Sequence, residues 1–445
     1  MSAGHSLSDP LVYVRAVHFA ATLQVAGVAF FLVFIAEPAF RNAASDTRVA
    51  AKVRSRLTWL AWIGLVLAVI SGAAWLVLTA AAMSQQPLAG VFSGGVLWTV
   101  LSDTTFGNDW LLRAVLACLL AGLFAPALSQ QRIASPGVKS ALVISAAALV
   151  GSLAWAGHAA GGIGVEATVH PIADVLHLVA AAAWVGALIP LALLLSTVTQ
   201  EAASLAIART ATLHFSTLGI ASVATLLATG LINTWYLAGS VPALVGTDYG
   251  RLLLAKIAVF LCMVAIAAFN LLRLTPRIVK IANVTAAQHA LGQLRRNAAI
   301  ETVAGAIVLT IVGVLGTLPP AIHAAHHHPV YGAVPADAAF QHIHTDQGMA
   351  DVTIMPGRVG TARATIRLWT EDFEPLAAKE VTLTVTPPAA GSKPTTRVAS
   401  QDSDGAWQVD GIELSQPGNW TVTVGALLGP HKHILLDAPI VIESK

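Results

Sequence analysis

Long apolar runs separated by short polar segments fill the first 320 residues of the chain. Eight runs approach or exceed the roughly 20 residues that an α-helix needs to cross a bilayer. Their bounds are Leu11–Ala36, Leu57–Ala82, Trp110–Leu128, Val138–Ala156, Ile172–Thr197, Thr212–Ala238, Arg251–Leu274 and Asn297–Leu318. The pattern predicts an all-α polytopic membrane bundle of eight transmembrane helices, residues 1–320.

Basic residues are concentrated in alternate connections between these runs. The first connection holds Arg41, Arg48, Lys52, Arg54 and Arg56, and the seventh holds Arg277, Lys280, Arg295 and Arg296. The third and fifth connections also carry basic residues, whereas the second and fourth carry none. Because short cytoplasmic loops are rich in Lys and Arg, the odd-numbered connections are predicted to face the cytoplasm and both termini the outside.

The spans of the two halves of the bundle resemble each other. Glycine follows histidine by nine residues in the first span (His18, Gly27) and in the fifth (His177, Gly186). The second and sixth spans each carry a small residue, a glycine and a tryptophan: Ser71, Gly72, Trp75 and Thr229, Gly230, Trp235. The third and seventh follow Gly107-Asn108-Asp109 and Gly246-Thr247-Asp248. These matches indicate a 4+4 parallel repeat; the alternative is chance similarity among Ala/Leu/Gly-rich segments.

The composition changes after Pro319-Pro320, where Thr and Val alternate between closely spaced turn residues. This pattern predicts a small all-β sandwich domain. We assign residues 321–341 to a His-rich tether and 342–445 to the external β-sandwich. The candidate strands are Asp351–Met355, Arg363–Trp369, Glu380–Thr386, Ala406–Val409, Trp420–Val424, Ile434–Leu436 and Ile440–Glu443.

Composition agrees with a membrane protein and excludes several other classes. The chain is 56% hydrophobic and only 11% charged, which is too apolar for a soluble enzyme of this length. A net charge of +2 gives no basic surface for nucleic acid. No nucleotide-binding motif is present. The two cysteines, Cys118 and Cys262, lie within predicted spans and form neither a disulfide framework nor a metal-binding Cys pair. We do not expect an enzyme.

Histidine is the unusual residue, and it is distributed unevenly. Of 15 histidines, only His214 and His289 fall on the predicted cytoplasmic side. Imidazole is the commonest metal ligand in proteins and suits copper, zinc and nickel. The asymmetry therefore indicates capture of a metal ion from the exterior.

The sharpest candidate site is a hairpin between the fourth and fifth spans. If Pro171 opens a helix, His170, Asp174 and His177 share one stripe of it. His158 closes the preceding span, and His18 lies at a similar depth in the first. Ionisable groups inside apolar spans are expensive and mark functional sites, so we predict a metal site here. The alternative is that these groups only hydrogen-bond between helices.

The segment after the last span offers a second group of metal ligands. His326, His327 and His328 precede a proline in the tether, and His342 and His344 alternate just before the first expected strand, as His431 and His433 do near the end. Met349 adds a soft thioether, which suits Cu(I). A mixed His/Met set without Cys fits copper, Cu(I) or Cu(II), although zinc also binds imidazole.

The chain resembles the CopD family of bacterial copper-resistance membrane proteins over roughly Leu11–Pro320. The residues that carry the resemblance are Trp155-Ala156-Gly157-His158, the run from His177 to Gly186, and Leu315-Gly316-Thr317-Leu318-Pro319-Pro320. The segment from His342 to Ile354 is similar to the external YtkA/FixH-like domain at the C-terminus of some family members. The resemblance implies a bacterial inner (plasma) membrane protein with periplasmic termini that moves copper, most often toward the cytoplasm.

Some relatives carry a copper-binding CopC domain before the first span. Met1 lies only about ten residues from the first span here, so we expect capture to fall to the C-terminal domain or to a separate periplasmic CopC-like chaperone. Two further interpretations stay open. One is a membrane electron carrier in which His18 and His177 hold haem b. The other is a copper-binding scaffold or sensor that transports nothing, or an external domain that only binds a partner protein.

Overall fold

The protein is described by a computed structural model covering residues 9–42, 47–84, 87–92, 95–128, 135–156, 166–199, 201–280, 284–318, 321, 335, 337–345, 348–370, 375–388, 393–429 and 432–444. The chain divides into two compact units, residues 1–328 and 329–445. The first unit is helical and the second is built of β-strands, as the sequence predicts. Each unit is considered by itself.

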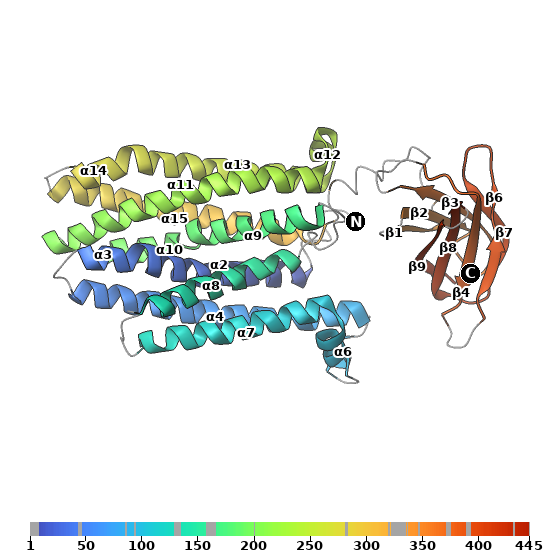
Figure 1. Ribbon diagram of the computed structural model, residues 1–445, viewed down its shortest axis with the longest axis horizontal. Coiled ribbons are helices and arrows are strands. Elements are labelled where there is room, and N and C mark those ends of the chain that lie inside the picture. The colour runs from blue at the N-terminus through green and yellow to red at the C-terminus, as the bar shows by residue number, and fades with distance from the viewer. Residues whose placement is uncertain are drawn as a thin grey trace. The chain divides into compact units, whose positions relative to one another are not determined.

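The helical unit contains long helices that run along a common direction (Figure 1). Among the described residues, eight helices are long and apolar enough to cross a membrane, which confirms the predicted eight-helix bundle. In chain order the elements are α2 (Pro10–Phe31), η1 (Leu32–Ala36), α3 (Glu37–Asn42), α4 (Thr47–Ser84), α5 (Leu88–Val91), α6 (Val96–Asp103), α7 (Thr105–Leu128), α8 (Pro136–Gly151), η2 (Ser152–Ala156), α9 (Glu166–Trp184), α10 (Leu188–Ser196), α11 (Ala202–Ala238), α12 (Val241–Gly246), α13 (Asp248–Phe269), η4 (Asn270–Leu274), α14 (Thr275–Lys280) and α15 (Val284–Leu315).

The bundle consists of two sets of helices that meet at α2 and α9. In the first half α2 packs on α4 and α8, and α4 packs on α7; in the second α9 packs on α11, and α13 on α15. Figure 1 shows α7 and α4 on one side of the bundle and α11 and α13 on the other, with α2 and α9 between them. Each half therefore contributes one central helix.

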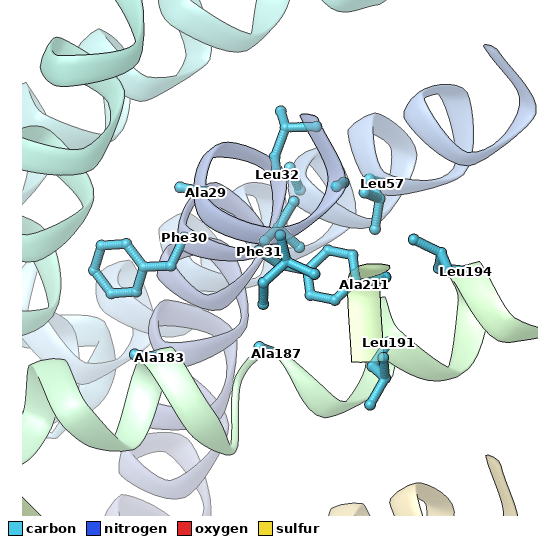
Figure 2. Close-up of a cluster of buried hydrophobic side chains, with 14 of the residues drawn as sticks. Ala29, Phe30, Phe31, Leu32, Leu57, Ala183, Ala187, Leu191, Leu194 and Ala211 are labelled. Atoms are coloured by element: carbon cyan, nitrogen blue, oxygen red, sulfur yellow. The ribbon is translucent and has the colours of Figure 1, made fainter. Parts of the chain in front are cut away.

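The centre of the unit is an apolar core around Phe31. This side chain is fully buried, and residues of α4, α10 and α11 surround it, among them Leu57, Leu191 and Ala211 (Figure 2). Lipid-facing positions are equally apolar: Ile70 of α4 and Leu231 of α11 are exposed. Because both the interior and the outer surface are apolar, the polar side chains that remain inside the bundle stand out.

The two halves are in direct backbone contact at a pair of glycines. A Cβ added to Gly27 of α2 would lie 2.2 Å from the carbonyl carbon of Gly186, and one added to Gly186 would lie 2.4 Å from the Leu23 oxygen. Gln24 donates a hydrogen bond to the Gly186 oxygen across the same contact, at 3.1 Å. These are the glycines that follow His18 and His177 by nine residues. Only glycine lets two helices approach this closely.

The second unit is a sandwich of two antiparallel sheets. One has strand order β1-β2-β3-β7-β6 and the other β5-β4-β8-β9. The strands are β1 (Ala339–Thr345), β2 (Gly348–Met355), β3 (Gly360–Trp369), β4 (Glu380–Thr386), β5 (Thr395–Val398), β6 (Ser400–Gln401), β7 (Trp407–Leu414), β8 (Gly418–Gly429) and β9 (Lys432–Ile442). Alternate residues of both sheets fill one core that includes Trp420.

The strand prediction differs from the structure at three places. His342 and His344 lie inside strand β1 and do not merely precede the first strand. The last two candidates, around Ile434 and Ile440, form the single strand β9, because Pro439 pairs opposite Thr421 without ending the ladder. Strands β5 and β6 were not predicted, since their residues are all exposed and show no apolar alternation.

The glycine contact generates a stability prediction. Replacing Gly27 by Ala forces α2 away from the turn between α9 and α10, because the new methyl group overlaps the backbone of Gly186. We expect a loss of about 1–3 kcal/mol, the usual cost of overpacking, seen as a lower midpoint of thermal unfolding in detergent. Gly122 of α7 is the matched control, since a Cβ there meets nothing within 4 Å. A Gly122→Ala variant as unstable as Gly27→Ala would contradict the prediction.

Candidate metal site

His18 is buried in the first half and held by α4. Its side chain is 6% exposed, and Nδ1 lies 3.0 Å from the Ala68 oxygen and 3.1 Å from the Ser71 hydroxyl. The Ser71 hydroxyl donates its own hydrogen to the Leu67 oxygen at 2.6 Å. A carbonyl can only accept, so His18 donates through Nδ1 and presents its lone pair at Nε2. Gly72 makes room for the ring, 3.2 Å from where a Cβ would lie.

His177 repeats this arrangement in the second half. Its Nδ1 lies 2.9 Å from the Thr229 hydroxyl, and that hydroxyl donates to the Thr225 oxygen at 2.7 Å. His177 therefore also donates through Nδ1 and keeps a lone pair on Nε2. Gly230 lies beside its ring, as Gly72 lies beside that of His18. This is the tautomer in which imidazole coordinates a metal through Nε2.

The structure corrects the alignment of the third and seventh spans. The Thr104 hydroxyl caps α7 by accepting from the Gly107 amide at 3.0 Å, and Thr247 caps α13 by accepting from Gly250 at 2.9 Å. The equivalent residues are thus Thr104 and Thr247, and the predicted match of Gly107 with Gly246 is displaced by four positions. With this alignment Arg113 corresponds to Lys256, since each follows its capping threonine by nine residues.

The charges at equivalent positions differ between the halves. Arg15 precedes His18 by three residues, and Asp174 precedes His177 by three. In the first half Arg15 and Arg113 lie over the Trp75 ring, 5.2 and 5.3 Å from its centre. Arg113 also pairs with Asp109. Two guanidinium groups beside His18 oppose the binding of a cation there.

The second half combines the imidazole with a carboxylate. Asp174 accepts a hydrogen bond from Asn233 at 2.5 Å and interacts electrostatically with His170 and Lys256. His170 is buried, stacks on the Tyr236 ring at 5.2 Å, and its Nε2 has no hydrogen-bond partner among the described residues. We name His170, Asp174, His177, Thr229, Asn233 and Lys256 the second-half site. It holds two imidazoles and a carboxylate, which are metal ligands, and a lysine that balances the carboxylate.

The structure separates some of the residues that the sequence groups together. His18 faces α4 and His177 faces α11, so each imidazole belongs to its own half. Within the described residues no three His, Cys, Asp or Glu side chains are close enough to enclose one metal ion. The predicted ligands His158, His326, His327, His328 and His431 lie outside the described residues.

The β-sandwich places its predicted ligands differently. His342 of β1 lies 2.6 Å from Asp351, directly opposite on β2. The Trp369 indole donates to the other Asp351 oxygen at 2.9 Å, so the carboxylate orients the imidazole. His433 is exposed on β9, and His344 pairs with Met349 in the ladder. Met349 is 0% exposed, so its sulfur lies in the core and not at the surface with His433.

Sequence reasoning did not place Thr229, Asn233 or Lys256 in the metal site. Thr229 stands in the repeat that the sequence shows, but only the packing of α9 on α11 places its hydroxyl on His177. Asn233 lies one turn further along α11, which brings it to Asp174. A polar residue in an apolar span is the signal that could have found all three.

Known proteins resemble this chain along the helical unit. Residues 6–169 match the family model of the copper resistance protein D-like N-terminal domain, and residues 209–315 match that of copper resistance protein D. Copper resistance protein D of Pseudomonas syringae pv. tomato is 30% identical over 323 residues, covering 72% of this chain and 99% of the relative.

Two other relatives match most of the chain. Inner membrane protein YebZ of Escherichia coli (strain K12) is 31% identical over 316 residues, covering 69% of this chain and 98% of the relative. Copper transport protein CutJ of Bacillus subtilis (strain 168) is 28% identical over 346 residues, or 77% of this chain. The chain spans 60% of the length of that relative.

The histidine contact generates a second prediction. Replacing Thr229 by Val keeps the shape but removes the acceptor of the His177 Nδ1–H group. We expect the unsatisfied donor to cost about 1–3 kcal/mol, measured by thermal unfolding. The control is Thr225→Val, because the Thr225 hydroxyl is exposed and bonds only to the Ala221 oxygen in its own helix. Equal losses in the two variants would refute the assigned hydrogen bond.

Proposed function

The chain belongs to the copper resistance protein D family, and from that premise we propose that it transports copper across the bacterial inner membrane through the second-half site. The observation that carries the proposal is the set of side chains at this site. His177 presents Nε2 inside the bundle, and Asp174 and His170 lie one and two turns before it on the same helix. Imidazole and carboxylate ligands bind copper ions.

Electrostatics supports the second half over the first. Arg15 and Arg113 flank His18, whereas the second-half site has one cation, Lys256, which interacts with both Asp174 and His177. A cation crossing an apolar bundle needs a negative charge, because desolvation is otherwise uncompensated. Around its histidine each half holds one carboxylate beside a cation, Asp109 with Arg113 and Asp174 with Lys256, and among the residues that the structure describes only the first half adds a second cation, Arg15.

We propose uptake toward the cytoplasm, with both termini in the periplasm. The orientation of the termini rests on the basic residues of the odd-numbered connections, and the direction of transport rests on the family resemblance alone. The β-sandwich would then capture copper at His342 and at the exposed His433, with the histidines of the tether or a periplasmic CopC-like chaperone as further donors. A ligand tethered to the transporter raises the local copper concentration. The family is one of transport and resistance proteins, and we assign the chain no catalytic reaction.

The two rival interpretations have less support. Haem b held between His18 and His177 needs both imidazoles on one iron, but each faces a different helix. A scaffold or sensor that binds copper without moving it fits the second-half site equally well. Measurement of copper flux into proteoliposomes separates it from a transporter.

Replacing His177 by Ala tests the site directly. We expect copper uptake by cells or proteoliposomes to fall at least tenfold, because the ligand with the free Nε2 is gone, while the protein remains folded. His289→Ala, at an exposed position near the start of α15, should keep wild-type uptake. Wild-type uptake by the His177→Ala variant would remove the second-half site from the transport path.

Replacing His342 by Ala tests capture by the β-sandwich. If His342 only delivers copper, the variant should need several-fold more copper for half-maximal uptake while its maximal rate stays unchanged. Asp351→Asn should give a smaller shift of the same kind, since that carboxylate orients the ring. A lower maximal rate with no change in the half-maximal concentration would contradict a role in capture.

A further inference from the structure

A cavity of about 320 Å³ lies in the second half of the bundle, and its lining extends along α11 from Thr212 to Leu227, two residues before Thr229. It is lined by residues of α10, α11, α13, η4 and α15 and by Trp184 of α9. Gly219 lines it, ten residues before Thr229 on α11, which corresponds to about 15 Å along the helix. Ile220 and Leu227 also line it and are exposed, so the cavity opens at the outer surface of the bundle.

The lining is mostly apolar, with the hydroxyl groups of Thr212, Ser216 and Thr275 and a polar group centred on Glu301. Its side chain is 1% exposed, and Oε1 accepts a hydrogen bond from the Asn270 amide at 2.9 Å. The Asn297 side-chain amide in turn donates to the side-chain oxygen Oδ1 of Asn270 at 2.6 Å. Both partners are neutral. In the part of the chain that the structure describes, Glu301 forms no ion pair, although each unpaired buried charge costs several kcal/mol.

The charged and titratable residues of the surrounding elements do not reach Glu301. None of them lines the cavity: Arg209 and His214 of α11, Arg273 of η4, Arg277 and Lys280 of α14, Asp248, Arg251 and Lys256 of α13, Arg15 and His18 of α2, and His289, Arg295 and Arg296 of α15 itself. His214 lies against the Phe34 oxygen instead, at 3.2 Å. Element α10 carries no charged residue. A proton or an incoming cation must therefore neutralise Glu301.

The backbone is unusual at the same place. Asn270 begins η4, a π-helical segment that interrupts the α13–α14 helix, and the Thr275 hydroxyl donates to the backbone carbonyl oxygen of Asn270 at 3.1 Å. Such wide turns are rare and recur at functional sites. Trp184, which lines the cavity, packs in an apolar cluster with Leu226 and Met263, and along α9, α11 and α13 these residues stand between the positions of the second-half site and the part of the cavity that holds Glu301. The carboxyl group is thus separated from the second-half site by a hydrophobic barrier.

We propose that Glu301 is a proton-exchange site that couples copper movement to proton counterflow. It holds a proton while the cavity is empty. When a copper cation enters, the carboxyl O–H bond breaks, the proton leaves to water on the side from which copper came, and the cation neutralises the carboxylate. Once copper departs to the other side, a proton from that side rebinds. This inference rests on the proposed copper transport, but its chemistry can be tested without transport.

The first test is reaction with dicyclohexylcarbodiimide, an apolar reagent that adds to protonated carboxyl groups in apolar surroundings. With the full-length protein in detergent, mass spectrometry should find the adduct on Glu301, forming more slowly as pH rises and when copper is added. Glu37 is the matched control: it is also 1% exposed, but it is paired with Arg54 at 2.7 Å, so it should not react. An unmodified Glu301, or modification that is independent of pH, would overturn the proposal.

The second test measures copper and protons together in proteoliposomes with a trapped pH dye and a clamped membrane potential. Copper entry should make the lumen alkaline. This signal should vanish in Glu301→Gln and return in part in Glu301→Asp. Copper entry without alkalinisation in the wild type would refute proton exchange and leave transport intact. Absence of copper entry in the wild type would refute transport, and the carbodiimide reaction would then decide the role of Glu301.

Discussion

The close contact between Gly27 and Gly186 fixes the geometry of the helical unit. Two backbones meet there without side chains between them, so the central helices of both halves are held at one point and in one register. His18 and His177 each precede their glycine by nine residues, and this common distance places the two imidazoles at equivalent positions. The positions of the two histidines therefore depend on a contact between two glycines, neither of which has a side chain that could bind a ligand.

Equivalent positions have acquired opposite electrostatic character. Each histidine donates through Nδ1 to a hydroxyl group that itself donates to a backbone oxygen of its own helix. The same arrangement of hydrogen bonds therefore sets the same tautomer in both halves. The residue three positions earlier is Arg15 in one half and Asp174 in the other. A duplicated fold thus gives one half suited to a cation and another whose arginines lie on a tryptophan ring. This asymmetry is what we expect of a path used by a positive ion.

The second half contains polar groups at two depths, with apolar packing between them. Asp174 and His177 lie near one end, and Glu301 with its two asparagines lies beyond Trp184. An ion that moves between them must cross a layer with no ligands, which requires the layer to open. Neutralising each carboxyl group in turn lowers the cost of that movement, because an unpaired charge is never left in an apolar interior.

The eight spans and the all-β second unit followed from the sequence, because hydrophobic length and alternation are local properties of the chain. The spacing of nine residues between histidine and glycine in the first and fifth spans is also visible in the sequence. Which helix each imidazole faces is a tertiary property: His177 meets Thr229, 52 residues away, and no local pattern encodes that pairing. The alignment of Arg113 with Lys256 and the burial of Met349 were likewise settled by packing. Sequence determined which residues are costly to bury, and only the fold decided which of them share a site.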